Sequence, residues 1–233
     1  MMAAAPGAGY HPAGVTAKVS VLPPIVRTSA GHGHNMAIGE DGTLWAWGEN
    51  HLGQLGLSDT ANRYTPTRVG TNADWVHVSA GRGTHTLGIR KDSSGNRTLW
   101  AWGYNQNGQL GLGDTEDRNT PTRVGTYTDW VHVSAGGTHT MGIREDGEGT
   151  RTLWAWGDNL TNQLGLGDTA AYSTPTRVMF DTSGWQTVSA GSQHTLAVRE
   201  DSAGPRTLWV WGRGSGLGLG DTAIRTTPTQ VMP

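Results

Sequence analysis

The chain has 233 residues, a formal net charge of −2 and no cysteine. The missing cysteines exclude disulfides, thiolate metal sites and cysteine nucleophiles, and a balanced charge without a lysine or arginine run argues against a protein that binds DNA or RNA. No apolar run reaches the length of a signal peptide or the ~20 residues of a transmembrane helix. We therefore expect a protein without membrane contact, with the cytoplasm as its default compartment.

The first 24 residues differ from the rest of the chain. They are rich in alanine, glycine and proline and match nothing later, so they are interpreted as a flexible leader in which residues 18–22 could add to a sheet edge. From residue 25 onward the sequence repeats with tryptophan and glycine signatures, which is typical of propeller blades. The predicted units span about 25–73, 74–128, 129–183 and 184–233.

Each unit contains the sequence Leu-Trp-Ala-Trp-Gly, with valine replacing alanine in the last copy, and the copies begin 55, 54 and 55 residues apart. Successive side chains of a strand point to opposite faces, so leucine and alanine face one way and both tryptophans the other. A strand that is apolar on both faces needs covering on both sides. We therefore expect these tryptophans to be structural core: Trp45, Trp47, Trp100, Trp102, Trp154, Trp156, Trp209 and Trp211.

The second unit displays the order of elements most clearly. Strands are predicted over 74–81, 85–90 and 98–103, with a polar hairpin loop over 91–97. A long glycine-rich connection over 104–119 leads to a last short strand over 120–124, where Pro121 indicates an edge position. Four strands in each of four units predict an all-β array of antiparallel blades.

This unit resembles the RCC1 (regulator of chromosome condensation) repeat, in a form of the bacterial type. The matching residues include Trp102-Gly103-Tyr104-Asn105, Gly108–Thr115, Thr120–Val124 and Ser134–Thr140. The resemblance implies a β-propeller, which in this family usually has seven blades. With four repeats present, we favour an open or partial ring over a closed ring of four, and the exposed terminal blades could then support self-association.

Histidines recur once per unit after a Ser-Ala-Gly corner. One per blade is too far apart for a shared zinc ion with ligands at ~2 Å, so we interpret them as structural residues that bond the backbone of a tight turn. They are His34, His85, His139 and His194.

Aspartates in the recurring Asp-Thr turns lack the further ligands of a calcium loop, and we expect them to bond their own turn backbone. They are Asp59, Asp114, Asp168 and Asp221. The glycine-rich segment over 214–220 is not followed by the helix that a phosphate loop needs. The sequence therefore predicts no catalytic residue, no metal site and no cofactor.

Residues that differ between copies in the long connections are the candidate partner-binding positions, because loops on a rigid scaffold commonly carry recognition. Tyrosine and arginine among them are typical of binding hot spots. The set comprises Asn50, His51, Arg63, Tyr64, Tyr104, Gln106, Asp117, Arg118, Asn119, Asp158, Leu160, Tyr172, Arg213 and Arg225.

The predicted function is a non-enzymatic scaffold whose loop rim binds a protein. The resemblance implies two specific versions, since the family includes an exchange factor for a small GTPase and an inhibitor of β-lactamases. The alternative from a different class is a lectin-like or hydrolytic propeller with a central cluster of histidine and aspartate.

Overall fold

The computed structural model describes residues 22–178, 183–200 and 204–231. These residues form four antiparallel sheets and one short 3-10 turn, η1 (Gly214–Gly216), so the prediction of an all-β array of four-stranded blades is confirmed. Residues 1–21 lie outside the described part of the chain. They include most of the predicted leader over 1–24 and most of the edge strand proposed for 18–22.

The strands of the four blades have the following bounds. Blade 1 contains β1 (Ile25–Ala30), β2 (His34–Gly39), β3 (Leu44–Gly48) and β4 (Arg63–Arg68); blade 2 contains β5 (Trp75–Ala80), β6 (His85–Lys91), β7 (Arg97–Gly103) and β8 (Arg118–Arg123); blade 3 contains β9 (Trp130–Ala135), β10 (His139–Glu145), β11 (Arg151–Gly157) and β12 (Tyr172–Arg177); blade 4 contains β13 (Trp185–Ala190), β14 (His194–Glu200), β15 (Arg206–Gly212) and β16 (Arg225–Gln230).

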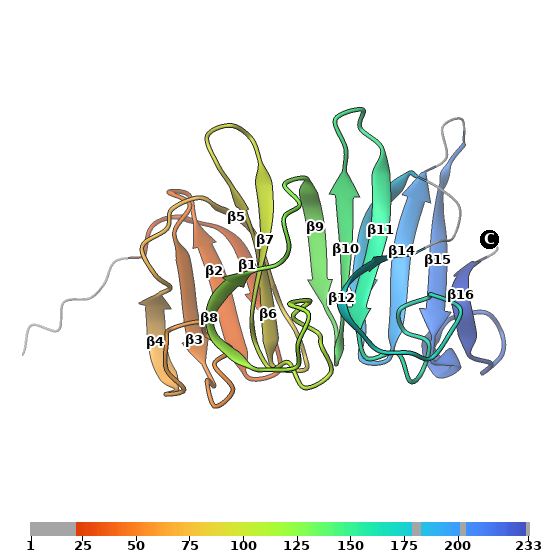
Figure 1. Ribbon diagram of the computed structural model, residues 1–233, viewed down its shortest axis with the longest axis horizontal. Helices are drawn as coiled ribbons and strands as arrows, with labels where there is room; N and C mark the ends of the chain where they lie inside the picture. The colour runs from red at the N-terminus through yellow and green to blue at the C-terminus, as the bar shows by residue number, and fades with distance from the viewer. Residues whose placement is uncertain (1–21, 179–182, 201–203, 232–233) are drawn as a thin grey trace, which may run out of the picture.

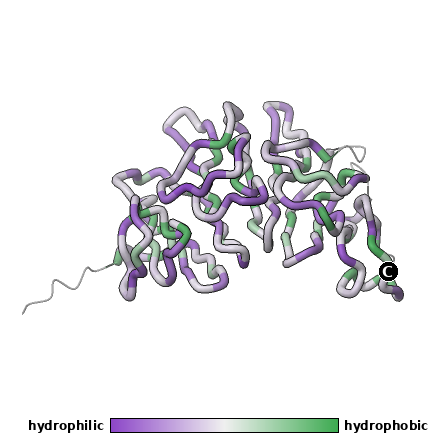
Figure 2. Tube along the Cα trace, turned by 60° about the horizontal axis from the view of Figure 1, so that its bottom comes forward, coloured by the Kyte–Doolittle hydropathy of each residue, from purple (hydrophilic) through white to green (hydrophobic). Residues whose placement is uncertain are grey.

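Each blade is a simple meander, because its strands pair in the order in which they occur in the chain. The first strands of successive blades contact one another, while blades 1 and 4 lie at opposite ends of the row (Figure 1). Hydrophilic stretches follow the loops and hydrophobic stretches lie within the blades (Figure 2). The described residues therefore form an open array, as the sequence analysis favoured.

A hydrophobic core fills each junction between blades, and the tryptophan strand contributes to two of them. Leu99 and Ala101 of β7 share a core with Trp156 of blade 3, whereas Trp102 on the opposite face shares a core with Met36 of blade 1. All five side chains are fully buried. The prediction that this strand is covered on both faces is confirmed for the inner blades.

Within the described chain, each end blade has a neighbouring blade on only one side. Trp47 occupies in blade 1 the position of Trp102 but is only partly buried. Leu208 occupies in blade 4 the position of Leu99 and is 41% exposed. The difference follows directly from the missing neighbour on that side.

A hydrogen-bond relay crosses each junction. His85 Nε2 lies 3.1 Å from the hydroxyl of Thr140 in the next blade, and this hydroxyl donates to the carbonyl of Gln109 at 2.7 Å. Since the hydroxyl proton is directed at Gln109, the imidazole donates through Nε2 and is in the neutral Nε2–H form. The indole of Trp156 donates to the same carbonyl at 2.9 Å.

The relay recurs between His34 and Thr86 and between His139 and Thr195. We expected these histidines to bond the backbone of their own turns, and this expectation is wrong. The imidazole reaches across to the next blade instead, so the partner lies 52 to 56 residues away in the chain. His194 belongs to the last blade and is only partly buried.

Replacing Thr140 with valine is expected to lower the free energy of unfolding by about 1–3 kcal/mol, because the buried N–H of His85 loses its acceptor. Valine keeps the shape and the β-branching of threonine. Thr122→Val is the matched control, since that hydroxyl bonds only the nearby carbonyl of Thr120 on an exposed strand. Urea unfolding followed by tryptophan fluorescence measures both, and equal losses would contradict the relay's role.

The long loops between third and fourth strands are held by the next blade. The amide of Ser58 donates to the carbonyl of Asn119 at 2.9 Å, and that of Gly113 to Ser173 at 2.9 Å. Gly111 has φ +75° and lies against Trp156, where a Cβ atom would come within 2.8 Å of the indole nitrogen. Glycine is required here by both the backbone conformation and the close approach, and the loop shape is fixed by packing.

Candidate binding rim

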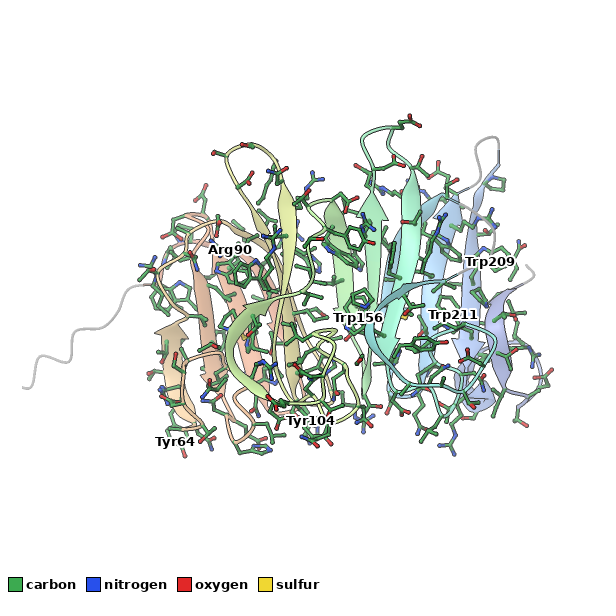
Figure 3. The ribbon with its side chains drawn as sticks, viewed as in Figure 1. Tyr64, Arg90, Tyr104, Trp156, Trp209 and Trp211 are labelled. Carbon is green, nitrogen blue, oxygen red and sulfur yellow. The ribbon has the colours of Figure 1, made fainter. Side chains whose placement is uncertain are left out.

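The loops between third and fourth strands project from one end of the array, and the hairpins between second and third strands project from the other (Figure 1). We call the first end the loop rim; it comprises residues 49–62, 104–117, 158–171 and 213–224 and the first residues of β4, β8, β12 and β16. Tyr64 and Tyr104 lie at this end, whereas Arg90 lies towards the hairpin end (Figure 3). Most of the predicted partner-binding residues are thus brought to one end.

Each of the first three rim loops is built around an asparagine. Asn105 Nδ2 donates to the carbonyl of Asp114 at 3.1 Å, and its Oδ1 accepts the amide of Leu110 at 2.9 Å. Asn50 and Asn159 make the same bonds in their loops. Asn50 is 0% exposed, so its predicted role as a partner contact is replaced by a structural one.

A second shared device closes the loops and involves several predicted contact residues. Arg118 pairs with Asp114 at 2.6 Å, and the same aspartate accepts the backbone N–H of Glu116. In blade 3 a tyrosine substitutes, because the hydroxyl of Tyr172 donates to Asp168 at 2.9 Å. The prediction that these aspartates bond their own turn is therefore confirmed.

The same arginine–aspartate pair closes the loops of blades 1 and 4 and stabilises the charged form of the aspartate. The hydrogen bond from Arg63 is the main cause that lowers the pKa of Asp59, and the bond from Arg225 does so for Asp221. These arginines are thus a shared position four residues after the aspartate, not copy-specific loop residues. They also begin the fourth strands, which start two residues earlier than the strand predicted at Thr120.

Three other predicted residues are likewise engaged within the fold. Asp117 Oδ1 accepts the amide of Asn105 at 2.7 Å, and Asp158 accepts bonds from Thr138 and Gln163. Arg213 donates to the side chain of Gln193. Part of the hydrogen-bonding capacity of these side chains is therefore already used within the fold.

All but one of the remaining candidates are open to solvent. Tyr64 is 93% exposed and Leu160 is 77% exposed. His51, Gln106 and Asn119 are exposed as well, and Tyr104 is partly buried.

A pocket of about 280 Å³ lies at the junction of the blade 1 and blade 2 loops. It is lined by His51, Leu52, Thr60, Asp117, Arg118 and Asn119. The rim thus combines isolated apolar side chains, which water solvates poorly, with a polar hollow between blades.

The buried histidines between the blades stabilise the fold. Burial lowers the pKa of His34 and of His139 to about 4, which holds both imidazoles neutral in their relays. His77 and His132 extend across the junctions to the carbonyls of Val133 and Val188 at 3.0 and 2.9 Å. Among the described residues no group of three or more His, Cys, Asp or Glu side chains is placed to hold a metal ion.

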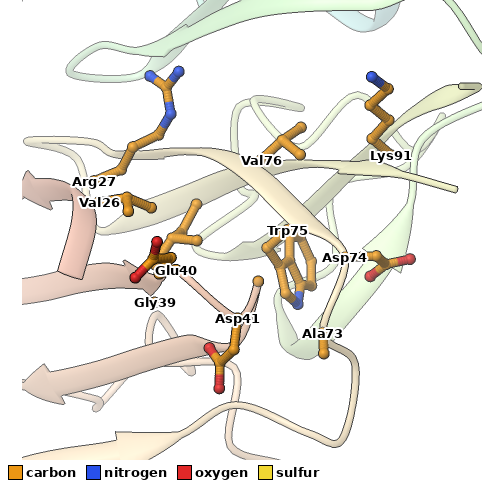
Figure 4. Close-up of a pocket in the computed structure, with 12 residues that line it drawn as sticks. Val26, Arg27, Gly39, Glu40, Asp41, Ala73, Asp74, Trp75, Val76 and Lys91 are labelled. Carbon is orange, nitrogen blue, oxygen red and sulfur yellow. The ribbon is translucent and has the colours of Figure 1, made fainter. Parts of the chain in front are cut away.

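Two further observations concern the described residues. Within the described residues, no helix is long and apolar enough to cross a membrane. A hollow of about 600 Å³ at the hairpin end was not predicted (Figure 4). It includes Arg27 and Lys91, and the sequence distinguishes one of these residues, because Lys91 stands where the other copies have glutamate.

Two models of one repeat family match this chain. The family model for the regulator of chromosome condensation (RCC1) repeat matches residues 41–89, 98–143 and 152–198. A second model of the same repeat matches residues 25–54 and 130–163.

Individual relatives are similar over most of this chain. The ultraviolet-B receptor UVR8 of Arabidopsis thaliana is 33% identical over 207 residues, which is 87% of this chain and 45% of that protein. The human E3 ubiquitin-protein ligase HERC2 is 32% identical over 203 residues, 84% of this chain and 4% of that protein. The chain thus spans less than half the length of these curated relatives.

A solved structure has the same fold. The crystal structure of Prp20p from Saccharomyces cerevisiae, described together with that protein's binding to Gsp1p and histones, matches with a TM-score of 0.75 at 24% identity. The match covers 90% of this chain and 50% of that one. The open row of blades therefore corresponds in extent to half of a solved propeller chain.

Proposed function

This chain belongs to the family of RCC1-repeat proteins, and on that premise we propose that it is a non-enzymatic scaffold that binds a protein through its loop rim. The observation that carries the proposal is the exposure of Tyr64 (93%), at the start of β4, and of Leu160 (77%), in a loop that the neighbouring blade holds in place. A rigid platform with exposed aromatic and aliphatic side chains loses little conformational entropy on binding.

The chemistry of the rim favours a protein over a small ligand. The hollow at His51 and Asn119 has a volume of about 280 Å³, which is just below the ~300–1,000 Å³ typical of small-molecule sites. The exposed side chains are spread over three blades, and a protein surface could contact them together.

Replacing Tyr64 with alanine is expected to weaken partner binding by about 10-fold or more, because exposed tyrosines are frequent hot spots worth ~2 kcal/mol. Leu160→Ala should add to the loss. Both side chains are solvated in the free protein, so thermal unfolding should be unchanged. The experiment compares the proteins retained by the immobilised wild-type chain and by each variant, followed by measurement of Kd for the retained partner.

Glu148→Ala serves as the control, because Glu148 is exposed on a hairpin at the opposite end. Partner binding that survives in the double variant Tyr64→Ala, Leu160→Ala but falls in Glu148→Ala would place the interface elsewhere and refute the rim proposal.

Two specific partners are proposed forms of this function. Prp20p was described with its binding to Gsp1p, and an exchange-factor-like activity would accelerate nucleotide release from a small GTPase. An inhibitor-like activity would instead suppress hydrolysis by a β-lactamase. Each assay with the Tyr64→Ala variant tests whether the rim is the contacting surface.

A further inference from the structure

Lys91 reverses a charge that the other repeats keep. It ends β6, and the residues at the same place in the other blades are Glu40, Glu145 and Glu200. All three of those residues are acidic. The reversal is confined to blade 2.

In the following blades the glutamate is neutralised by the arginine opposite it on the next strand. Arg151 pairs with Glu145 at 2.5 Å and Arg206 pairs with Glu200 at 2.9 Å. In blade 2 the residue opposite Lys91 is Arg97. Two cations therefore face each other where the fold elsewhere places an ion pair.

This arrangement is unfavourable in the free protein. Like charges directly opposite on neighbouring strands destabilise a sheet, and within the described residues neither Lys91 nor Arg97 has an ion pair. The nearby aspartates Asp74 and Asp129 are paired with Arg90 and Arg144 instead. Within the described residues, the positive charges of Lys91 and Arg97 are therefore not neutralised by an ion pair.

These cations line one cavity. A hollow of about 390 Å³ between blades 2 and 3 is lined by Lys91 and Arg97 of blade 2, Arg151 of blade 3 and Arg27, which extends from blade 1. The cavity's single carboxylate is Glu145. His77 also lines it, and burial lowers the pKa of His77 to about 4, so it adds no charge near neutral pH.

Four cations and one carboxylate give this cavity a net charge of +3. Figure 4 shows the guanidinium of Arg27 and the ammonium of Lys91 pointing to the same side of β5, away from Glu40 and Asp41. Glu40 and Asp41 therefore do not enter this cluster, and Asp74, which also lines the neighbouring hollow, pairs with Arg90. A concave site with one sign of charge concentrates counter-ions of the opposite sign.

We propose that this cavity binds a ligand carrying two neighbouring phosphate groups. Each phosphate carries about −1.5 to −2 near pH 7, so two of them offset the net charge of the cavity. Guanidinium groups bind phosphate oxygens in a bidentate manner, and a lysine ammonium adds a point charge. The phosphates could belong to a free diphosphate or to a doubly phosphorylated peptide segment. The site lies away from the loop rim and is independent of the function proposed for it.

Lys91→Glu is the informative variant. It restores the glutamate–arginine pair of the following blades, so the fold should be retained, but it lowers the cavity charge from +3 to +1. Titration calorimetry with pyrophosphate at low ionic strength is expected to give at least about a 10-fold weaker Kd for this variant, because exposed charges act strongly only within a Debye length. Glu145→Gln is expected to bind pyrophosphate more tightly than the wild type.

Arg206→Gln is the matched control. It removes an arginine at the position of Arg97 but in blade 4, outside the cavity, and should leave pyrophosphate binding unchanged. Equal affinity of the wild type and Lys91→Glu for pyrophosphate, or no binding to either, would overturn the proposal.

A peptide with two adjacent phosphoserines forms the second arm of the experiment. Tighter binding of this peptide than of pyrophosphate, lost in Lys91→Glu, assigns the site to a phosphorylated protein; the reverse order assigns it to a free diphosphate. A single-stranded oligonucleotide that binds more tightly than both and is also lost in Lys91→Glu would overturn the diphosphate proposal in favour of nucleic acid.

Discussion

Replacing Trp156 with alanine is expected to destabilise the chain by about 3–5 kcal/mol, the cost typical of deleting a large buried aromatic side chain. Trp156 is 0% exposed, shares the core of the blade 2–blade 3 junction and meets Trp130 edge to face at 5.7 Å. Its indole also donates to the carbonyl of Gln109. Such a loss is a large part of the ~5–15 kcal/mol that stabilises a typical domain.

Trp47→Ala provides an internal comparison. Trp47 has the same place in its strand but is only partly buried, since no described blade precedes it. We expect its loss to cost about 1 kcal/mol or less. Urea unfolding at equilibrium measures both variants, and equal destabilisation would show that burial between blades is not the source of stability.

If Trp156→Ala does not fold, Trp156→Phe keeps an aromatic ring and removes the N–H group. This variant should cost about 1–2 kcal/mol, because the carbonyl of Gln109 retains the hydroxyl of Thr140 as a donor. An unchanged free energy of unfolding in Trp156→Phe would show that the indole hydrogen bond does not contribute to stability.

Acidification is expected to destabilise the chain steeply between about pH 6.5 and pH 4. Burial lowers the pKa of His85 to about 3 and of His34, His77 and His139 to about 4, and also lowers that of His132. The unfolded chain takes up protons on these side chains below about pH 6.5, while the folded chain keeps them neutral. The unfolded state thus binds more protons in this window.

The sign follows from this difference in bound protons. Stability is fully present above about pH 6.5 and is lost as the pH falls towards the lowered pKa values, by on the order of 1–3 kcal/mol for each strongly shifted histidine. The hydrogen bonds that lower the pKa of Asp41, Asp59, Asp92 and Asp221 add a separate loss at more acidic pH.

His85→Gln tests the assignment to the relay. The glutamine amide can still donate to Thr140, but it does not titrate, so the free energy of unfolding should fall less steeply between pH 6.5 and pH 4 than in the wild type. Urea unfolding at a series of pH values measures the slope. A slope identical to that of the wild type would mean that His85 does not contribute to the loss of stability in acid.

Much of the fold could be predicted from spacing and alternation alone. The Leu99–Gly103 strand has no polar face, and this requires covers on both sides, which the structure provides. The open array was favoured because the chain has four repeats where the family usually has seven blades, and in the structure Leu208 and Trp47 are left partly uncovered in the end blades.

The candidate site was predictable only in its location. Differences between copies placed Tyr64 and Leu160 at the loop rim, but they could not separate accessible side chains from those that close a loop. Arg63, Arg118 and Arg225 act four residues after an aspartate, and that role depends on where the fourth strand begins. The histidine relay joins residues about one repeat apart, so no local pattern could reveal its partners.

The equivalence of the three junctions has a consequence for how this molecule can vary in size. At each of them a serine hydroxyl accepts the amide of an alanine in the next blade, Ser29 to Ala80, Ser79 to Ala135 and Ser134 to Ala190. An excision of residues 76–130 would join Trp75 to Val131 in the register of an ordinary blade. Stability in such a chain grows approximately as a sum over coupled units, as in a one-dimensional lattice, so whole units can be gained or lost while the shared junction contacts form between the units that remain.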